Sequence, residues 1–323
     1  MKKNNILILS AGRRVELVQS FQAELAQLIP SSKVITVDLE PNLSPACQMA
    51  DKFYKAPIAS SVNYISFLKK ICEKESIGLV IPTNDSELLA LASHRVFFKN
   101  IGVNIVISEI PLVSACRNKN LLASIFHEME LDSPIIYNKN NLSFPCFVKP
   151  YDGSSSIGAY TLIDQNMLTK KILNNKKNMF MELVPSSYDE YTIDIYYDKN
   201  GILKSFVPRL RIQTRSGEIS KGVTKKNYVY EYLLNKLPNL TGARGCITLQ
   251  VFANKKENSF KAIEINPRFG GGYPLSWSAG ANFPRMMIKE YILDEQLNFF
   301  DNWEANLLML RYDAKILLND YKS

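Results

Sequence analysis

The sequence predicts an α/β fold that begins with a parallel β-sheet, and three observations support this prediction. Over roughly the first 115 residues, short apolar runs such as residues 6–9 alternate with segments whose apolar residues recur at helical spacing. Alternation of this kind gives a parallel sheet with helices on both faces. The chain of 323 residues is long enough for two or three packed subdomains.

The predicted elements of this first region follow in regular order. The strands are residues 6–9, 34–37, 79–81 and 103–107, and the helices are 15–29, 64–74 and one that starts at 87–92. Ligands of such sheets bind beyond the carboxyl ends of the strands. Residues 10–14 and 82–87 are the two polar segments at such ends. The first has a glycine turn without the three-glycine spacing of a dinucleotide site.

Composition excludes several classes of protein. Hydrophobic content of 46% and charged content of 22% are typical of a soluble globular protein. The sequence has no run of about eighteen apolar residues, so we expect no membrane span. Residues 6–9 are too short for a secretory signal. The five cysteines are scattered without metal-ligand spacing. They indicate reduced thiols and a cytoplasmic location.

The net charge of +8 raises the question of nucleic-acid binding. The basic residues are dispersed, many of them in Lys/Asn-rich loops, so we favour a solvated surface and expect no nucleic acid. A modest positive field would also attract ATP and carboxylates. His94 and His127 are the only histidines, and we expect structural roles for both.

The most informative segment is Glu264-Ile265-Asn266-Pro267-Arg268, which we predict closes an apolar strand that begins near Gln250. Side chains alternate across a strand, so positions 264, 266 and 268 converge on one point. A carboxylate and an amide oxygen suit Mg²⁺, and an arginine suits a phosphoryl group. The segment indicates the metal end of a nucleoside triphosphate site. The alternative is an ordinary edge strand that ends in a proline turn.

Gln250-Val251-Phe252, together with residues 264–268, resembles the metal-binding end of the ATP-grasp superfamily, most closely the carbamoyl-phosphate synthetase large-subunit branch. The resemblance implies that Gln250, Glu264 and Asn266 hold Mg²⁺, with Mn²⁺ as an alternative ion, between the phosphates of ATP. It also implies a catalytic role for Arg268. Many ATP-grasp ligases have an acidic residue in place of Gln250, so metal binding here should depend more on ATP itself.

The resemblance covers essentially the whole chain and implies three regions. These are a Rossmann-like domain at residues 1–115, a small ATP-grasp subdomain at 116–185, and a large subdomain at 186–323 with the Mg²⁺ site and the C-terminal segment. The ATP-grasp part is α+β, and one such unit is present. In this family the loops of the first domain help to form the second-substrate site, which makes Arg13, Asp85 and Glu87 candidates. Helix N-capping or surface solvation is the alternative for each.

Lys149 ends a short apolar strand at residues 145–150, where an unpaired ammonium would be costly and a phosphate would serve as partner. A Gly/Ser loop follows, and consecutive N–H groups in such loops cradle anions. The resemblance implies that Lys149 contacts the α- and β-phosphates, that Lys119 faces them, and that the loop closes over them. The loop residues are Gly153, Ser154, Ser155, Ser156 and Gly158. A plain hairpin is the alternative.

The adenosine end is assigned from the resemblance to the strand at residues 179–182 and the turn after it. Glu182 would accept the exocyclic amine, Leu183 would line the hinge, and the Val184 N–H would meet a ring nitrogen. Glu190 would accept hydrogen bonds from the ribose. Charged residues at strand ends are usually solvated, which is the alternative for the two glutamates.

Further basic residues and a glycine are assigned to the reacting end. Arg211 or Lys221 would reach the γ-phosphate or an acyl phosphate, and Arg209 would bind a substrate carboxylate in bidentate fashion. A surface-exposed basic hairpin is the alternative. After Arg268, three glycines that include Gly271 let the chain pass close to the transferring phosphate.

The sequence therefore predicts a stand-alone carboxylate–amine or carboxylate–thiol ligase. In this family the substrate carboxylate attacks the γ-phosphate to give an acyl phosphate and ADP, and an amine or another nucleophile then displaces phosphate. The protein contributes positioning and charge neutralisation. Its expected partners are a small-molecule carboxylate and an amine, with no membrane, and the family suggests a homodimer. The alternatives are a non-catalytic ATP-binding or regulatory protein and a phosphotransferase that releases the phosphorylated product.

Overall fold

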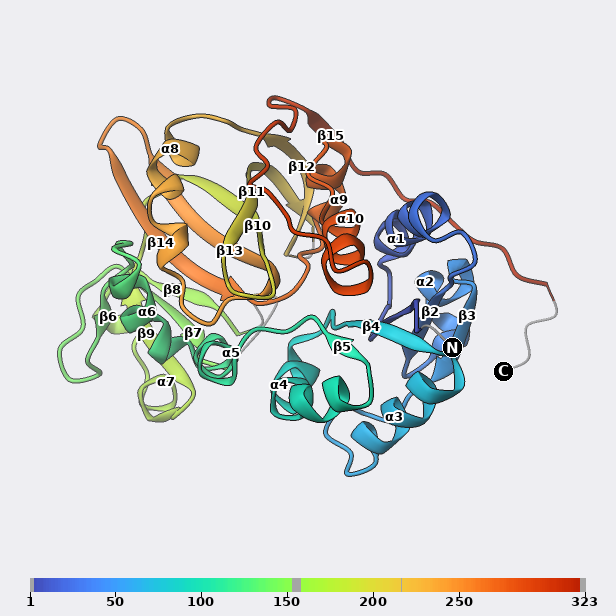
Figure 1. Cartoon of the computed structure of the whole chain (residues 1–323). Helices are drawn as coiled ribbons and strands as arrows, with labels where there is room; N and C mark the ends of the chain where they lie inside the picture. The colour runs from blue at the N-terminus through green and yellow to red at the C-terminus, as the bar shows by residue number, and fades with distance from the viewer. Residues whose placement is uncertain (1–2, 153–157, 216, 320–323) are drawn as a thin grey trace.

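Three β-sheets organise the part of the chain that the computed structural model describes, which is residues 3–152, 158–215 and 217–319. Figure 1 shows the first sheet and its helices on one side of the molecule and the other two sheets on the opposite side. A mixed α/β architecture of this kind confirms the predicted fold class.

The first sheet is parallel, with the strand order β3-β2-β1-β4-β5. Its elements are β1 (Asn5–Ile8), α1 (Val15–Leu28), β2 (Val34–Asp38), η1 (Pro41–Leu43), α2 (Pro45–Met49), β3 (Lys52–Lys55), α3 (Tyr64–Lys74), β4 (Ile77–Ile81), α4 (Asp85–Asn100) and β5 (Asn104–Ile105). Ile6 and Ile8 pack with residues of α1, whereas Leu7 packs with residues of α3 and α4. Burial on both faces explains why the strands are continuous apolar runs.

The second sheet is small and antiparallel, with the order β6-β9-β7-β8. Its region contains α5 (Ile110–Arg117), η2 (Lys119–Leu121), α6 (Leu122–Glu128), β6 (Ile136–Tyr137), β7 (Cys146–Pro150), β8 (Tyr160–Leu162), η3 (Gln165–Met167), α7 (Lys170–Asn174) and β9 (Asn178–Glu182). Cys146, Val148 and Phe180 form its core with Leu162. This sheet carries Lys149 at the end of β7.

The third sheet is antiparallel, with the order β14-β13-β10-β11-β12-β15. Its region contains β10 (Asp189–Tyr197), β11 (Leu203–Arg215), β12 (Glu218–Thr224), α8 (Tyr228–Leu234), η4 (Leu237–Asn239), β13 (Gly245–Asn254), β14 (Ser259–Asn266), α9 (Tyr273–Ser278), α10 (Phe283–Met287), the π-helical turn η5 (Ile288–Ile292) and β15 (Leu308–Leu310). Helices α9 and α10 follow the three-glycine segment, which therefore lies between this sheet and the first domain (Figure 1).

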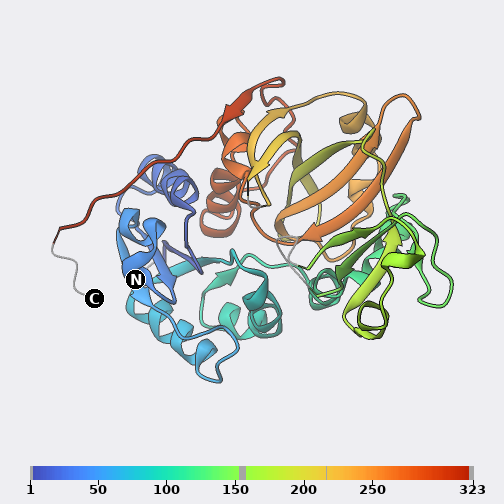
Figure 2. The same ribbon diagram turned by 180° about the vertical axis from the view of Figure 1, so that it is seen from behind.

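One large apolar cluster joins the first domain to the third sheet. Phe21 of α1 meets Phe269 edge-on, with ring centroids 6.1 Å apart. Glu24 of α1 accepts hydrogen bonds from Arg285 (2.7 Å) and Asn282 (2.6 Å). These contacts hold α1 against α10 and against Phe269, the residue that precedes the three-glycine segment. After β15 the chain runs past α1 along the first domain, as both views show (Figures 1 and 2).

One prediction about the strands was wrong. Residues 250 and 264 do not belong to a single strand, because β13 and β14 form a hairpin in which Gln250 pairs with Glu264. The turn between them includes Asn258 in the left-handed region at φ 49°. As cross-strand partners, Gln250 and Glu264 lie closer together than two residues so far apart along one strand would.

Candidate nucleotide and substrate site

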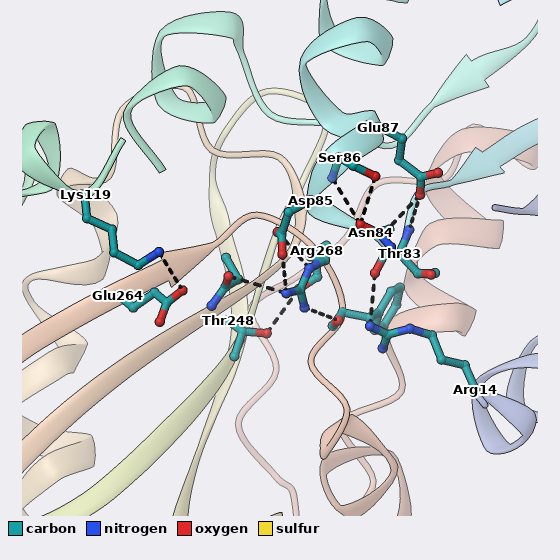
Figure 3. A network of polar contacts seen from close by, with 12 residues as sticks. Arg14, Thr83, Asn84, Asp85, Ser86, Glu87, Lys119, Thr248, Glu264 and Arg268 are labelled. Carbon is teal, nitrogen blue, oxygen red and sulfur yellow. Dashed lines mark hydrogen bonds and ion pairs between the residues drawn. The ribbon is translucent and has the colours of Figure 1, made fainter. Parts of the chain in front are cut away.

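Two lysines and a glutamate from three different elements meet between the second and third sheets. Lys119 Nζ of η2 lies 3.7 Å from Glu264 Oε1 of β14, and the Lys119 side chain is 9% exposed (Figure 3). Burial lowers the pKa of Lys149 to about 8, with Glu264 supporting its charge and Lys119 opposing it. Two lysines with one shared carboxylate leave an excess of positive charge, which suits a phosphate group.

The three predicted metal ligands gather on the β13–β14 hairpin. The Gln250 amide, turned so that both of its atoms are satisfied, donates to Glu264 Oε2 (3.3 Å) and accepts from Arg211 Nη1 (2.5 Å). Asn266 pairs with Thr248 on the same hairpin, and its Oδ1 lies 3.5 Å from Arg268 Nη2. These carboxylate and amide oxygens are of the type that Mg²⁺ prefers.

No group of three His, Cys, Asp or Glu side chains in the described ranges could hold a metal ion. A metal at the hairpin would therefore depend on Glu264, on the two amides and on oxygens that a ligand brings. Mg²⁺ is commonly held in this way, by one or two carboxylates and substrate phosphates. The residues present fit the ion that the sequence predicts, and their role as its ligands stays a proposal.

Arg268 makes a bidentate ion pair with Asp85, which begins α4 of the first domain. Nε donates to Oδ1 (2.8 Å) and Nη2 to Oδ2 (2.6 Å), while Nη1 donates to the Phe269 carbonyl (3.2 Å). Burial works against the Arg268 charge, but Asp85 outweighs it and raises the pKa. Thr248 Oγ1 also donates to the Arg268 carbonyl (3.1 Å; Figure 3). The guanidinium is thus fixed in direction at the junction of the domains.

Glu190, the predicted ribose acceptor, is occupied by Arg211 of the neighbouring strand. The two side chains are 2.6 Å apart, and Arg211 also donates to the Gly217 carbonyl (3.0 Å). Burial raises the pKa of Glu190, with Arg211 opposing the shift. Arg211 also contacts Gln250, and its predicted role at the γ-phosphate stays a proposal. Lys221, its predicted alternative, has an exposed side chain on β12.

The predicted adenine hinge lies at the end of β9. Glu182 accepts hydrogen bonds from the Ile135 N–H (3.0 Å) and from Lys261 Nζ (3.2 Å), and Leu183 and Val184 are half-buried after it. A small cavity of about 20 Å³ opens beside the hinge. It is lined by Lys119, Leu122, Ala123, Phe126, Ser133, Pro134, Ile136, Met179, Met181, Ala262 and Ile263. Its walls are mainly apolar, but its volume has room for only about one or two water molecules and not for an adenine ring in this conformation.

The predicted phosphate loop is described only at its end. Gly153, Ser154, Ser155 and Ser156 lie outside the described residues. Gly158 adopts φ +75°, a left-handed conformation that favours glycine, and a Cβ there would approach Pro150 to 3.3 Å.

Two of the predicted substrate residues have their polar groups committed within the protein. The carboxylate of Glu87 is completely buried in a capping box and accepts from the Thr83 N–H (2.9 Å), Ser10 Oγ (2.8 Å) and Tyr64 Oη (2.9 Å). Burial raises its pKa. The geometry thus favours the N-capping alternative for Glu87.

Arg209 is also internal, with 1% of its side chain exposed. It forms a bidentate pair with Asp194, at 2.7 and 3.0 Å, below the three-glycine segment. A Cβ at Gly272 would lie 2.3 Å from Arg209 Nη1, so the glycine allows the loop to cross the guanidinium. In this conformation Arg209 supports the loop, and no substrate carboxylate can reach it without displacing Asp194.

Two of the other substrate candidates, Arg13 and Gly271, line a cavity of about 170 Å³ between the first domain and the three-glycine segment, whereas Asp85 and Arg268 pair with each other outside its lining. It is lined by Ser10, Ala11, Gly12, Arg13, Arg14, Glu16, Leu17, Thr83, Asn84, Glu218, Gly270, Gly271, Tyr273, Pro274 and Arg311. Arg13 and Gly271 were predicted for the substrate site. Arg14, Glu218 and Arg311 were not, and only Arg14 had a signal in the sequence, as the neighbour of Arg13 in the glycine turn.

The basic residues and oxygen ligands at the junction of the sheets are typical of a nucleotide-binding α/β protein. Comparison with known proteins indicates the family. Residues 6–106 match a family model described as a PylC-like N-terminal domain. Residues 174–307 match a model described as ATP-grasp in the biosynthetic pathway with Ter operon. The second match assigns residues 174–307 to the ATP-grasp superfamily, with a single ATP-grasp unit in the chain.

Several solved structures share this fold. One is the biotin carboxylase domain dimer of Hydrogenobacter thermophilus 2-oxoglutarate carboxylase, in complex with MgADP, ADP and bicarbonate (TM-score 0.74, 13% identity, 94% of this chain and 73% of that one). Another is the ADP complex of PurK, N5-carboxyaminoimidazole ribonucleotide synthetase (0.71, 15%, 96% and 82%). A third is an L-amino acid ligase from Bacillus licheniformis (0.66, 15%, 90% and 75%). At these identities the likeness establishes the fold alone.

No helix in the described ranges is both long enough and apolar enough to span a membrane.

Proposed function

We propose that the protein is an ATP-dependent carboxylate–amine or carboxylate–thiol ligase that forms an acyl phosphate and releases ADP and phosphate. The observation that carries this proposal is the junction where Lys119 and Lys149 flank Glu264. The cross-strand partner Gln250 and the interdomain Arg268 complete it. Family membership supports the same chemistry, and so do the ligase and synthetase among the structural relatives.

The roles of the residues follow from their charges and their fixed positions. Lys149 and Lys119 would neutralise the phosphates, and Arg268, oriented by Asp85, would donate hydrogen bonds to the transferring group. Mg²⁺, when bound by Gln250, Glu264 and Asn266, would neutralise further phosphate charge and help to align the reactants. The protein supplies position and charge and needs no side-chain nucleophile.

At the adenosine end we keep the proposal that Glu182, Leu183 and Val184 contact adenine. Glu190 would turn toward the ribose only if it shared or released Arg211. The cytoplasmic location, the homodimer and the resemblance to carbamoyl-phosphate synthetase remain predictions of the sequence.

Hydroxylamine trapping tests the proposal. Purified protein is incubated with Mg²⁺, ATP, hydroxylamine and pools of small carboxylic acids, and hydroxamate and ADP are measured together. The proposal expects hydroxamate and ADP in equal amounts from one pool. Glu264→Gln should reduce this turnover on the order of 10²-fold, because it removes a charge that acts on the reacting phosphates, and should change ADP affinity far less. The matched control is Glu73→Gln, at a half-exposed residue that pairs with Lys69, which should have no effect.

Two results would contradict the proposal and select an alternative. ADP formed together with a stable phosphorylated acid, and no hydroxamate, would indicate a phosphotransferase. Tight nucleotide binding without turnover of any pool, and with no difference between wild type and Glu264→Gln, would indicate a binding protein.

A further inference from the structure

Several arginines line the cavity of about 170 Å³ at the domain junction, and they differ in whether a carboxylate neutralises them. Arg13 and Arg311 both face Glu218, at 3.9 and 3.3 Å. Arg268 close by is neutralised by Asp85. Arg14 differs from these arginines, because it makes no ion pair with any residue of the described ranges.

Arg14 donates from Nη2 to the Thr83 carbonyl (3.0 Å), which orients its guanidinium (Figure 3). Burial and, to a smaller extent, the neighbouring charge of Arg268 lower its pKa to about 10, against the weaker support of Glu218 and Asp85. A guanidinium in a confined site is stable when an anion accompanies it. The carbonyl of Thr83 satisfies one donor and brings no negative charge.

The backbone beside Arg14 also suits an anion. Arg14 is the N-cap residue of α1, and its side chain makes no hydrogen bond to the first turn of this 14-residue helix. Glu16 and Leu17 in that turn line the cavity. The first N–H groups of a helix lack intrahelical acceptors and carry partial positive charge, so they bind carboxylates and phosphates well. Helix and guanidinium thus present donors to the same cavity.

We propose that this cavity binds the anionic end group of the acid substrate, a carboxylate or a phosphate, with Arg14 and the start of α1 as its binding groups. That this anion belongs to the acid substrate rests on the proposed function, whereas anion binding in the cavity does not require ATP. The cavity is smaller than the roughly 300–1,000 Å³ of drug-sized ligand sites, so the bound part is small. The glycines of the neighbouring loop keep it open, because a Cβ at Gly271 would lie 2.9 Å from Glu218 Oε1.

Calorimetric titration of the full-length protein without nucleotide tests the proposal. Succinate and inorganic phosphate are the two anionic probes, which separate carboxylate from phosphate recognition, and succinamide is the uncharged control. We expect saturable binding of one anion and none of succinamide. Arg14→Gln should raise the dissociation constant at least about tenfold, the usual effect of losing a charged hydrogen-bond donor.

Three variants with the same or a similar change of charge serve as controls. Arg13→Gln, at a side chain that is 79% exposed, should change the dissociation constant less than about threefold, as expected for a screened surface charge. Arg215→Gln, which lies in an exposed pair with Asp313, should leave it unchanged. Lys149→Gln tests whether the bound probe occupies the nucleotide phosphate site instead, in which case this variant loses affinity and Arg14→Gln does not.

The proposal is overturned if neither anion binds the wild-type protein, if Arg14→Gln binds as tightly as wild type, or if Arg13→Gln or Lys149→Gln loses as much affinity. If Arg14→Gln does not fold, wild-type protein is treated with phenylglyoxal with and without the probe, and modification is located by peptide mass spectrometry. Protection of Arg14 supports the proposal and unaltered modification refutes it. Hydroxylamine trapping is scored separately, so the ligase proposal and this one can fail independently.

Discussion

Three bidentate Arg–Asp pairs of nearly equal geometry but different burial allow a graded test of what these interactions contribute to stability. The side chains of Arg209 and Asp194 are 1% and 0% exposed, those of Arg268 and Asp85 are 17% and 27%, and those of Arg215 and Asp313 are 70% and 78%. The perturbation is Asp→Asn at each pair in turn. This change keeps the shape of the side chain and removes its charge.

Burial decides the expected size of each effect. Asp194→Asn leaves an uncompensated guanidinium inside the sheet, and breaking such a pair costs about 3–5 kcal/mol. Asp194 also accepts from Ser276 Oγ (2.6 Å), which adds to the loss. Asp85→Asn leaves Arg268 partly solvated, which gives about 1–3 kcal/mol. Asp313→Asn should have no measurable effect, because both side chains of its pair are exposed and screened.

Thermal unfolding followed by circular dichroism measures the series. With roughly 2–4 °C per kcal/mol for a domain of 150–250 residues, Asp194→Asn should lower Tm by about 6–20 °C and Asp85→Asn by about 2–12 °C. The order of the three shifts is the decisive quantity. A loss for Asp313→Asn as large as that for Asp194→Asn would refute the reasoning, since all three pairs are bidentate with donor–acceptor distances of 2.6–3.0 Å and differ strongly in burial.

Two further predictions concern Lys149 and Gly78. A lysine in the unfolded chain has a pKa of about 10.4, whereas the pKa of folded Lys149 is about 8. Between these pH values the unfolded chain binds more protons than the folded protein. The stability of the ligand-free protein should therefore increase with pH in this range. Lys149→Met should remove that increase, which Tm measurements of both proteins from pH 7 to 10 would show; parallel curves would contradict it. A Cβ at Gly78 would lie 1.8 Å from the Lys3 carbonyl oxygen, so Gly78→Ala should cost about 1–3 kcal/mol of stability through forced backbone movement. An unchanged midpoint in urea unfolding would contradict this close contact.

Much of the first domain could be predicted because its strands are buried on both faces and its helices are amphipathic. The predicted strand at residues 34–37 and helix at 64–74 agree with β2 and α3. Strand β3 escaped prediction because Lys52 and Lys55 flank two half-buried aromatic residues, which leaves no apolar run. The β13–β14 hairpin was merged into one strand because both of its arms are apolar and its turn has no glycine or proline.

The candidate site could be predicted only where its residues are close in sequence. Glu264, Asn266 and Arg268 form one local pattern, but Asp85 lies 183 positions from Arg268, and no local signal connects them. The choice between Arg13 and Arg14 was also beyond the sequence. Both arginines line the cavity, but after a turn in which Ser10 and Gly12 take positive φ values of 47° and 50°, Arg14 donates to the Thr83 carbonyl and the Arg13 side chain stays 79% exposed.

The first domain contributes chemistry to the site as well as support, and the positions of three arginines argue for this. Arg268 follows the β13–β14 hairpin, which carries the predicted metal ligands, but its direction comes from Asp85 at the start of α4 in the first domain. Arg14 comes from the loop after β1, and its direction comes from Thr83, also after β4. Arg209 reaches neither cavity and supports the glycine loop between them. The segments after β1 and β4 of the parallel sheet therefore orient both Arg14 and Arg268, so a shift of this domain against the third sheet would change the proposed phosphate-side and substrate-side geometry together.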